Sequence, residues 1–154
     1  MGKIQKLFIF IMLIHFTSCE KDEVTYSFKE KEILRLINEH RTQEGLSTLE
    51  MHPVIYTVAK EHSENMAKGL VLFGHDGYYD RYNEIKNNLP NVTGGAENIL
   101  YGADTPQAVV QGWLMSSGHK ANIEGYYTLT GIASAEDKDG NLFYTQIFIR
   151  TEKN

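Results

Sequence analysis

Apolar residues recur at intervals of three and four along the first half of the chain, the spacing of helices with one buried face. The first predicted helix follows Ser27, which has the spacing of a capping box with Glu30, and Gly45 ends it. A second helix has Pro53 in its first turn and stops at Gly69. These two helices are the most strongly marked elements of the sequence.

Two weaker helical signals follow. The spacing of apolar residues predicts a third helix over residues 78–88. The fourth helix opens with Thr105 as its N-cap and Pro106 in its first turn, and it continues to Met115. Between the two, residues 89–95 are rich in turn-forming residues, so we expect an exposed loop there.

Three later segments have the character of β-strands. Residues 96–101 form a short extended segment, and residues 128–135 and 142–149 predict a pair of strands. Asp139 and Gly140 form a hairpin turn between that pair. Because helices come first and a hairpin comes last in a chain of 154 residues, we expect one α+β domain with helices packed on an antiparallel sheet.

The N-terminus has the features of an export signal. Lys3 and Lys6 precede an apolar run over residues 7–16, which is shorter than the roughly 20 residues that a spanning helix needs. Cys19 is the only cysteine, so disulfides within the chain are excluded. Its position after the run resembles a bacterial lipobox, whose cysteine is acylated. The alternative is an ordinary secretory signal with an incidental cysteine.

We therefore divide the chain into a lipoprotein signal peptide at residues 1–18, a tether at 19–27 and a domain at 28–150. Residues 20–23 are similar to the signal that sends some bacterial lipoproteins to the cell surface, and their alternative is a solvated acidic tether. The expected location is extracytoplasmic. The acylated Cys19 would anchor the chain in an outer membrane, with the domain facing either the periplasm or the cell surface.

The charge of the chain limits its partners. The net charge is −5 at pH 7, and the basic residues form no stripe. Nucleic acid is therefore not an expected partner, and an anionic lipid surface is a poor target for the domain itself. Contact with a membrane is expected only through the lipid on Cys19.

Three ionisable residues stand beside glycines and next to apolar elements, namely His75, Glu97 and His119. Glycine lets a backbone approach a ligand closely, and two imidazoles with one carboxylate can hold a divalent metal such as Zn²⁺ or move a proton. Each residue also has a plainer interpretation. His75 could be an exposed loop residue, Glu97 a surface residue, and His119 a cap on the C-terminal end of the fourth helix.

Four segments of the sequence resemble the CAP superfamily, also called SCP or PR-1-like, in its short bacterial form. They are residues 59–67, 73–77, 94–99 and 112–123, in this order, followed by a predicted strand at 143–148. The resemblance implies a three-layer α-β-α sandwich with an antiparallel central sheet. It also implies that His75, Glu97 and His119 line one cavity.

Eukaryotic members of that superfamily have a further glutamate, three positions after the tryptophan of the fourth helix. Ser116 occupies this position here, which weakens any mechanism that needs two carboxylates. Ser116 is then a candidate to line the cleft, and Asn98 is expected to bond to backbone and hold its turn. His62 lies on an apolar helix face, where it is either a core histidine or a residue that orients Glu97 or lines the same cavity.

Three functions are compatible with these residues. The first is a non-enzymatic binding module that holds a small ligand, lipid, glycan or protein in its cleft, with a divalent metal or without one. The second is a metal-assisted hydrolase of peptide or cell-envelope polymer, in which Glu97 is the catalytic residue and activates water. The third is a structural adhesion domain with a vestigial cleft. The resemblance and the missing fourth residue favour the binding module.

Overall fold

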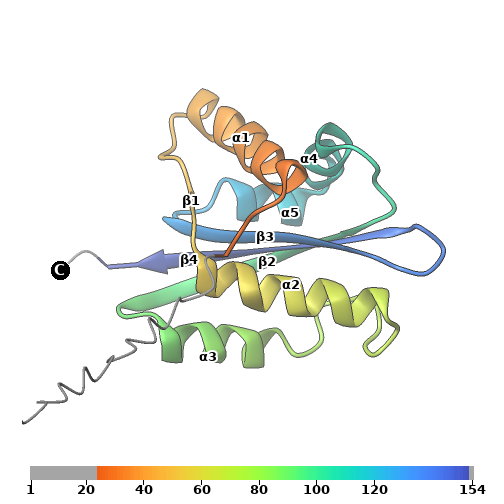
Figure 1. The fold of residues 1–154 in the computed structure, drawn as a ribbon. Helices are drawn as coiled ribbons and strands as arrows, with labels where there is room; N and C mark the ends of the chain where they lie inside the picture. The colour runs from red at the N-terminus through yellow and green to blue at the C-terminus, as the bar shows by residue number, and fades with distance from the viewer. Residues whose placement is uncertain (1–23, 153–154) are drawn as a thin grey trace, which may run out of the picture.

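Helices cover both faces of one β-sheet, so the chain forms three layers (Figure 1). The structure, a computed structural model, describes residues 24–152, and the predicted signal peptide, Cys19 and residues 20–23 lie outside that range. None of the helices in the described range is long and apolar enough to cross a membrane. The elements in chain order are α1 (Phe28–Gln43), β1 (Glu50–Met51), α2 (Pro53–Ala67), α3 (Tyr78–Asn88), β2 (Val92–Tyr101), α4 (Pro106–Met115), α5 (Ser117–Ile123), β3 (Leu129–Glu136) and β4 (Leu142–Thr151).

The sheet has the strand order β1-β3-β4-β2, which places β2 at one edge. β2 and β3 both pair antiparallel with β4, whereas the two-residue β1 pairs parallel with β3. Helices α1, α4 and α5 lie on one face, and α2 and α3 lie on the other (Figure 1). The predicted α+β sandwich is therefore confirmed. The sequence pattern does not predict β1, because two residues are too few to show an alternation.

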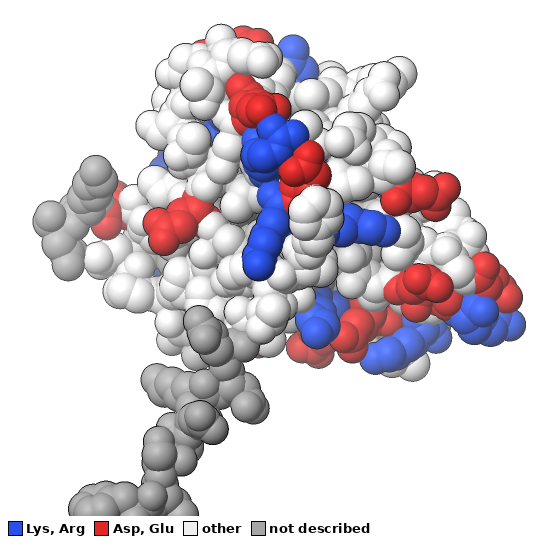
Figure 2. Space-filling view, turned by 45° about the horizontal axis from the view of Figure 1, so that its top comes forward, with Lys and Arg blue, Asp and Glu red and all other residues white. Residues whose placement is uncertain are grey.

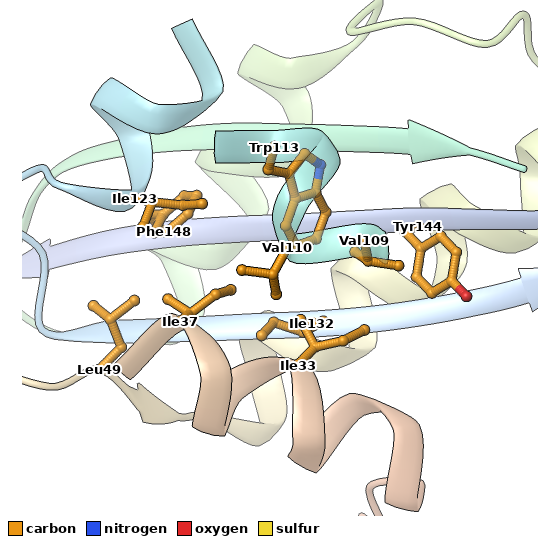
Figure 3. Packing of buried hydrophobic residues seen from close by; sticks show 10 residues of the cluster. All are labelled: Ile33, Ile37, Leu49, Val109, Val110, Trp113, Ile123, Ile132, Tyr144 and Phe148. Atoms are coloured by element: carbon orange, nitrogen blue, oxygen red, sulfur yellow. The ribbon is translucent and has the colours of Figure 1, made fainter. Parts of the chain in front are cut away.

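One hydrophobic core fills the space between the sheet and the helices α1, α4 and α5 (Figure 3). Its buried members are Ile33, Ile37, Leu49, Val109, Val110, Trp113, Ile123, Ile132, Tyr144 and Phe148. Trp113 is fully buried, and its indole Nε1–H donates to the backbone carbonyl of Ile99 at 3.1 Å. This bond fixes α4 to the edge strand β2, two residues from Glu97.

On the opposite face of the sheet, α2 packs closely against β3. A Cβ atom at Gly131 would come within 2.3 Å of the backbone of Ile55 and Tyr56. Ile55, Ala59 and Ile147 are fully buried in this layer. The absence of a side chain at Gly131 therefore sets the short distance between the helix and the sheet.

The predicted helix boundaries are confirmed where a local signal marks them. The Ser27 amide donates to the Glu30 carboxylate at 2.7 Å, and the Glu30 amide donates to the Ser27 hydroxyl at 3.2 Å, which completes the capping box. Thr105 caps α4 through its hydroxyl, and Pro53 opens α2. The third helix spans residues 78–88 as predicted.

The expected loop at residues 89–95 is wrong in its second half. β2 begins at Val92, which is buried, and it pairs with β4 from there on. Gly94 and Gly95 signal a turn when taken alone, but here they make room for neighbours. A Cβ atom at Gly95 would lie 2.9 Å from the carbonyl oxygen of Phe148 and 3.0 Å from the hydroxyl of Tyr78. Pairing with β4 thus overrides the local turn preference.

The expected position of His119 at the C-terminal end of the fourth helix is also wrong. α4 ends at Met115, and Ser116 has an extended backbone conformation that separates it from α5. The Ser116 hydroxyl accepts from the His119 amide at 3.5 Å and so caps α5. His119 therefore lies in the first turn of α5, where it has no free carbonyls of α4 to cap.

Gly131→Ala should destabilise the domain by about 3 kcal/mol or more, because the new methyl group would overlap backbone atoms of α2. Urea unfolding monitored by circular dichroism would measure the change. Gly118→Ala is the matched control. A Cβ atom at Gly118 would meet no atom within 4 Å, so this variant should be unchanged or up to about 1 kcal/mol more stable. Equal stability of the two variants would contradict the close α2–β3 contact.

Candidate functional site

A cleft of about 640 Å³ lies where the edge strand β2 meets the loop before α3 and the helix α5. Its lining residues are His75, Asp76, Gly77, Tyr78, Tyr79, Asp80, Ala96, Glu97 and Asn122. The aromatic rings of Tyr78 and Tyr79 lie 5.7 Å apart at one wall. Burial raises the pKa of Tyr78, so this residue is a neutral phenol at physiological pH. The cleft thus combines aromatic surface with carboxylates and one imidazole.

Glu97 is the most buried ionisable group of the cleft, with only 2% of its side chain exposed. Both of its carboxylate oxygens accept hydrogen bonds from Arg81, whose Nε and Nη2 each lie 2.8 Å away. Nδ1 of His75 lies 3.0 Å from one of the same oxygens. A bidentate arginine fork of this kind is the strongest common pairing of a carboxylate. Glu97 is therefore fixed in position, and most of the hydrogen-bond acceptor positions of its carboxylate are occupied.

Arg81 is a residue that the sequence analysis missed. Besides Glu97, its guanidinium donates to the backbone carbonyl of Asp76 at 2.9 Å. Arg81 thus ties the loop that carries His75 to the strand that carries Glu97. The signal that could have indicated it is the expectation that Glu97 lines a cavity, because a buried carboxylate needs a counter-charge and Arg81 stands in the helix just before that strand.

His62 supports the same loop from behind. It is buried in α2, and its Nε2 lies 3.0 Å from the backbone carbonyl of Gly74, next to His75. Burial lowers the pKa of His62, and the nearby Arg81 charge adds to the effect. The bond to Gly74 rather than to Glu97 favours the interpretation of His62 as a core histidine that holds the loop.

His119 lies beside the cleft, near His75, although it is not among the residues that line it. The two ring centroids are 6.4 Å apart, and the ring planes are inclined by 58°. Burial lowers the pKa of His119, and the neighbouring His75 lowers it further. Within residues 24–152, Nδ1 of His119 is buried without a hydrogen-bond partner. The lowered pKa favours the neutral imidazole, and its Nδ1 can form a further hydrogen bond or metal bond.

Two asparagines fix the backbone around these side chains. The Asn98 amide nitrogen donates to the carbonyl of His119 at 3.1 Å. The Asn122 amide nitrogen donates to the Asn98 side-chain oxygen at 2.9 Å and to the Glu97 carbonyl at 3.2 Å. Asn98 thus bonds to backbone as expected, but it joins β2 to α5 instead of holding a turn. Asn122 was missed, because an asparagine in a helix has no pattern that marks it.

Of the three residues that were predicted to share one cavity, His75 and Glu97 line the cleft, whereas His119 lies beside it, near His75. The Arg81 fork leaves Glu97 poorly suited to bind a metal directly, whereas a carboxylate bonded to a histidine commonly orients that histidine as a ligand. His75 and His119 are therefore the residues that fit a divalent ion, and Glu97 fits the supporting position. Within residues 24–152, the predicted set of His75, Glu97 and His119 does not form a group whose donor atoms all lie within 4.8 Å of one another, whereas His40 with Glu44 and Glu124 does.

Charges of both signs are mixed over the surface. On the face shown in Figure 2, Lys and Arg side chains lie among Asp and Glu side chains and form no continuous basic stripe. Within α1, for instance, Arg35 bonds to both Glu32 and Glu39.

Several known proteins are similar to this chain in sequence and in fold. The profile of the cysteine-rich secretory protein family, CAP, matches residues 34–148. Two Bacillus subtilis proteins are similar in sequence: the uncharacterized membrane protein YlbC is 34% identical over 86% of the chain, and the uncharacterized protein YkwD is 31% identical over 78% of it. The matches cover 38% and 46% of these two proteins, so the chain spans less than half the length of either relative.

Solved structures with the same fold come from several bacteria. An outer surface protein from Borrelia burgdorferi has a TM-score of 0.70 at 20% identity, covering 84% of this chain and 97% of that one. An extracellular protein from Bacillus anthracis that contains an SCP domain has a TM-score of 0.66 at 29% identity, covering 80% and 40% of the two chains. These neighbours establish the architecture.

Arg81→Met should lower the free energy of unfolding by about 3–5 kcal/mol, because it leaves the buried Glu97 carboxylate without its counter-charge. Adding Glu97→Gln should restore part of the loss, since the buried group is then neutral. A double-mutant cycle from urea unfolding would measure the coupling. Arg35→Met is the control: Arg35 forms a half-exposed surface pair, and its loss should change the stability far less than the loss of Arg81. Similar costs for both arginines would show that the Arg81 fork is unimportant.

Proposed function

Because the chain belongs to the CAP family, we propose that it is an extracytoplasmic, non-enzymatic binding module that holds its ligand in the cleft between α3 and α5. His75 and His119 contact the ligand, either directly or through a divalent cation such as Zn²⁺. The ligand is a small molecule, lipid, glycan or protein segment.

The observation that carries this proposal is the Arg81 fork on Glu97. A general base must have a lone pair free to accept a proton from water. Three of the roughly four lone-pair positions of Glu97 are taken by Arg81 and His75, and only 2% of its side chain is exposed, so little of the carboxylate is left to a water molecule. The position of the second family glutamate is filled by Ser116, which caps α5. Binding is therefore better supported than metal-assisted hydrolysis.

The two imidazoles suit a divalent cation. Since Nδ1 of His75 faces the Glu97 carboxylate, its Nε2 is the nitrogen available to an ion. Within the described part of the chain, the buried Nδ1 of His119 has no hydrogen-bond partner, which supports a role for it in holding a bound group. A bound Zn²⁺ would supply an electrophilic centre for an oxygen or nitrogen atom of the ligand.

An exposed aromatic surface beside the cleft also favours binding. Phe73 and Tyr101 are each about half exposed, and their ring centroids lie 6.1 Å apart. Phe143 stacks near both, with centroid distances of 6.3 and 4.8 Å. The loop that leads to His75 also exposes 70% of Leu70 and 83% of Leu72. Exposed apolar patches of this kind mark interaction surfaces, so the ligand has an apolar part.

The location of the protein is inferred from its N-terminus and its relatives. An acylated Cys19 and the following tether would hold the domain at an outer membrane, facing the periplasm or the cell surface. One sequence relative is named a membrane protein, and the structural neighbours include an outer surface protein and an extracellular protein. These names support an envelope location.

Cys19→Ser should abolish incorporation of radiolabelled palmitate and release the domain from the membrane fraction, since the anchor would be lost. Labelling in the producing cells followed by fractionation measures both effects. Ser18→Ala is the control, because a small residue before the cysteine should leave acylation intact. Label on the Cys19→Ser chain would refute the anchor at this residue.

Zinc titration tests the cleft. In the full chain carrying Cys19→Ser, which removes the only thiol, His75→Ala with His119→Ala should lower the number of Zn²⁺ ions bound by one. Binding should weaken from pH 7.5 to pH 6, because metal requires neutral imidazoles. The expected effect is about fourfold per imidazole of ordinary pKa. It is smaller for His119, whose pKa is lowered. Isothermal titration calorimetry measures both quantities.

His52→Asn is the matched control for this titration. It removes an imidazole outside the cleft and keeps a side chain able to cap α2. If the chain with His75→Ala and His119→Ala bound as many Zn²⁺ ions as before, the metal-assisted form of the proposal would be refuted. If the protein hydrolysed an envelope peptide or glycan, and Glu97→Gln abolished that hydrolysis, the hydrolytic function would replace the binding function as the proposal.

A further inference from the structure

A second group of metal-binding side chains lies outside the cleft, where the end of α1 meets the end of α5. His40 and Glu44 are four residues apart in the last turn of α1, so they share one side of the chain there. Glu124 is the C-cap residue of α5. Nε2 of His40 lies 2.8 Å from Oε1 of Glu124, and one donor atom from each of the three residues lies within 4.8 Å of the others.

These distances are close to those of a bound ion. Imidazole nitrogens and carboxylate oxygens bind Zn²⁺ at about 2.0–2.2 Å, so tetrahedral ligand atoms lie roughly 3.4 Å apart. The three donor atoms already lie within 4.8 Å of one another, so side-chain adjustments alone would bring them to that spacing. One imidazole with two carboxylates is a ligand set that suits Zn²⁺, with water in the fourth position.

The backbone around the group is fixed without any ion. Arg41 is 1% exposed, and its Nη1 donates to the carbonyl oxygens of Ile123 and Gly125 at 2.5 and 2.9 Å. These two carbonyls flank Glu124, so Arg41 holds the end of α5 against the helix that carries His40 and Glu44. A site whose ligands sit on fixed backbone needs little rearrangement to bind.

Charges of both signs surround the group. Two carboxylates face His40, and the opposing charges are Arg41, which bonds to the backbone on either side of Glu124, and Lys120, whose ammonium lies 3.6 Å from Glu124. The Lys120 side chain is 46% exposed, so it can turn into solvent when an ion takes its place.

We propose that His40, Glu44 and Glu124 form a divalent-cation site, distinct from the cleft, that ties the end of α1 to the end of α5. The helix α5 also carries His119 and Asn122, so the ion would stiffen one wall of the cleft. The preferred ion class is a borderline transition metal such as Zn²⁺.

The test uses the full chain with Cys19→Ser, His75→Ala and His119→Ala, which removes the thiol and both cleft imidazoles. Titration with ZnCl₂ alone should show one bound ion per chain, with ring resonances of His40 shifting in the NMR spectrum. Glu44→Gln should weaken this binding at least tenfold, since even outer-sphere changes cost 10–100-fold. Glu39→Gln removes an equal charge from the same helix and should change the affinity less than twofold.

Absence of zinc binding in this background, or equal affinities of the Glu44→Gln and Glu39→Gln variants, would show that the group is only a surface ion pair. Zinc that shifts the ring of His52 but not that of His40 would also overturn the site. If the cleft variant does not fold, the same glutamine pair is compared in a chain with an intact cleft. There Glu44→Gln alone should remove one ion while the ring shifts of His75 and His119 remain, which separates this site from the cleft.

Discussion

The ion pair between Arg81 and the buried carboxylate of Glu97 is the interaction on which the cleft depends. A carboxylate removed from water is costly unless it is paired and fully hydrogen-bonded, and the arginine fork provides both. Because the same guanidinium bonds to the carbonyl of Asp76, neutralising the charge on β2 also positions the loop before α3. His75 is therefore held against the sheet although half of its side chain is exposed.

One of the helices that cover the edge of the sheet also builds one side of the cleft. β2 is an edge strand, and open edges invite pairing with other chains. Here Trp113 and Asn122 donate to the carbonyls of Ile99 and Glu97, so α4 and α5 cover part of that edge. The same placement of α5 brings His119 to within a ring-to-ring distance of 6.4 Å from His75. The CAP family is named for cysteines, yet this chain has only one, so disulfides within the chain do not stabilise this arrangement.

The elements and residues that the sequence predicted correctly depend on neighbours within a few positions. Ser27 and Glu30 bond to each other's backbone three residues apart, and Pro53 marks the first turn of its helix through its own ring. The glycine-flanked motifs around His75 and Glu97, with the family resemblance, indicated a shared cleft because their order along the chain is itself the signal. The capping pair and the start of α2 could be predicted since their residues are close in sequence, whereas the cleft came from the family resemblance, because His75 and Glu97 are 22 residues apart.

Only the tertiary structure decided which groups meet. Arg81 stands 16 residues from Glu97 without a motif, and their pairing follows from the way α3 packs against β2. Gly94 and Gly95 form part of β2 because the backbone there pairs with β4. His119 lies in a separate helix, α5, because the extended backbone of Ser116 ends α4. The amino-acid sequence by itself determined the first four helices, the hairpin and two of the residues that line the cleft, His75 and Glu97. Their roles came from packing, since a buried charge takes its partner from whichever element lies against it.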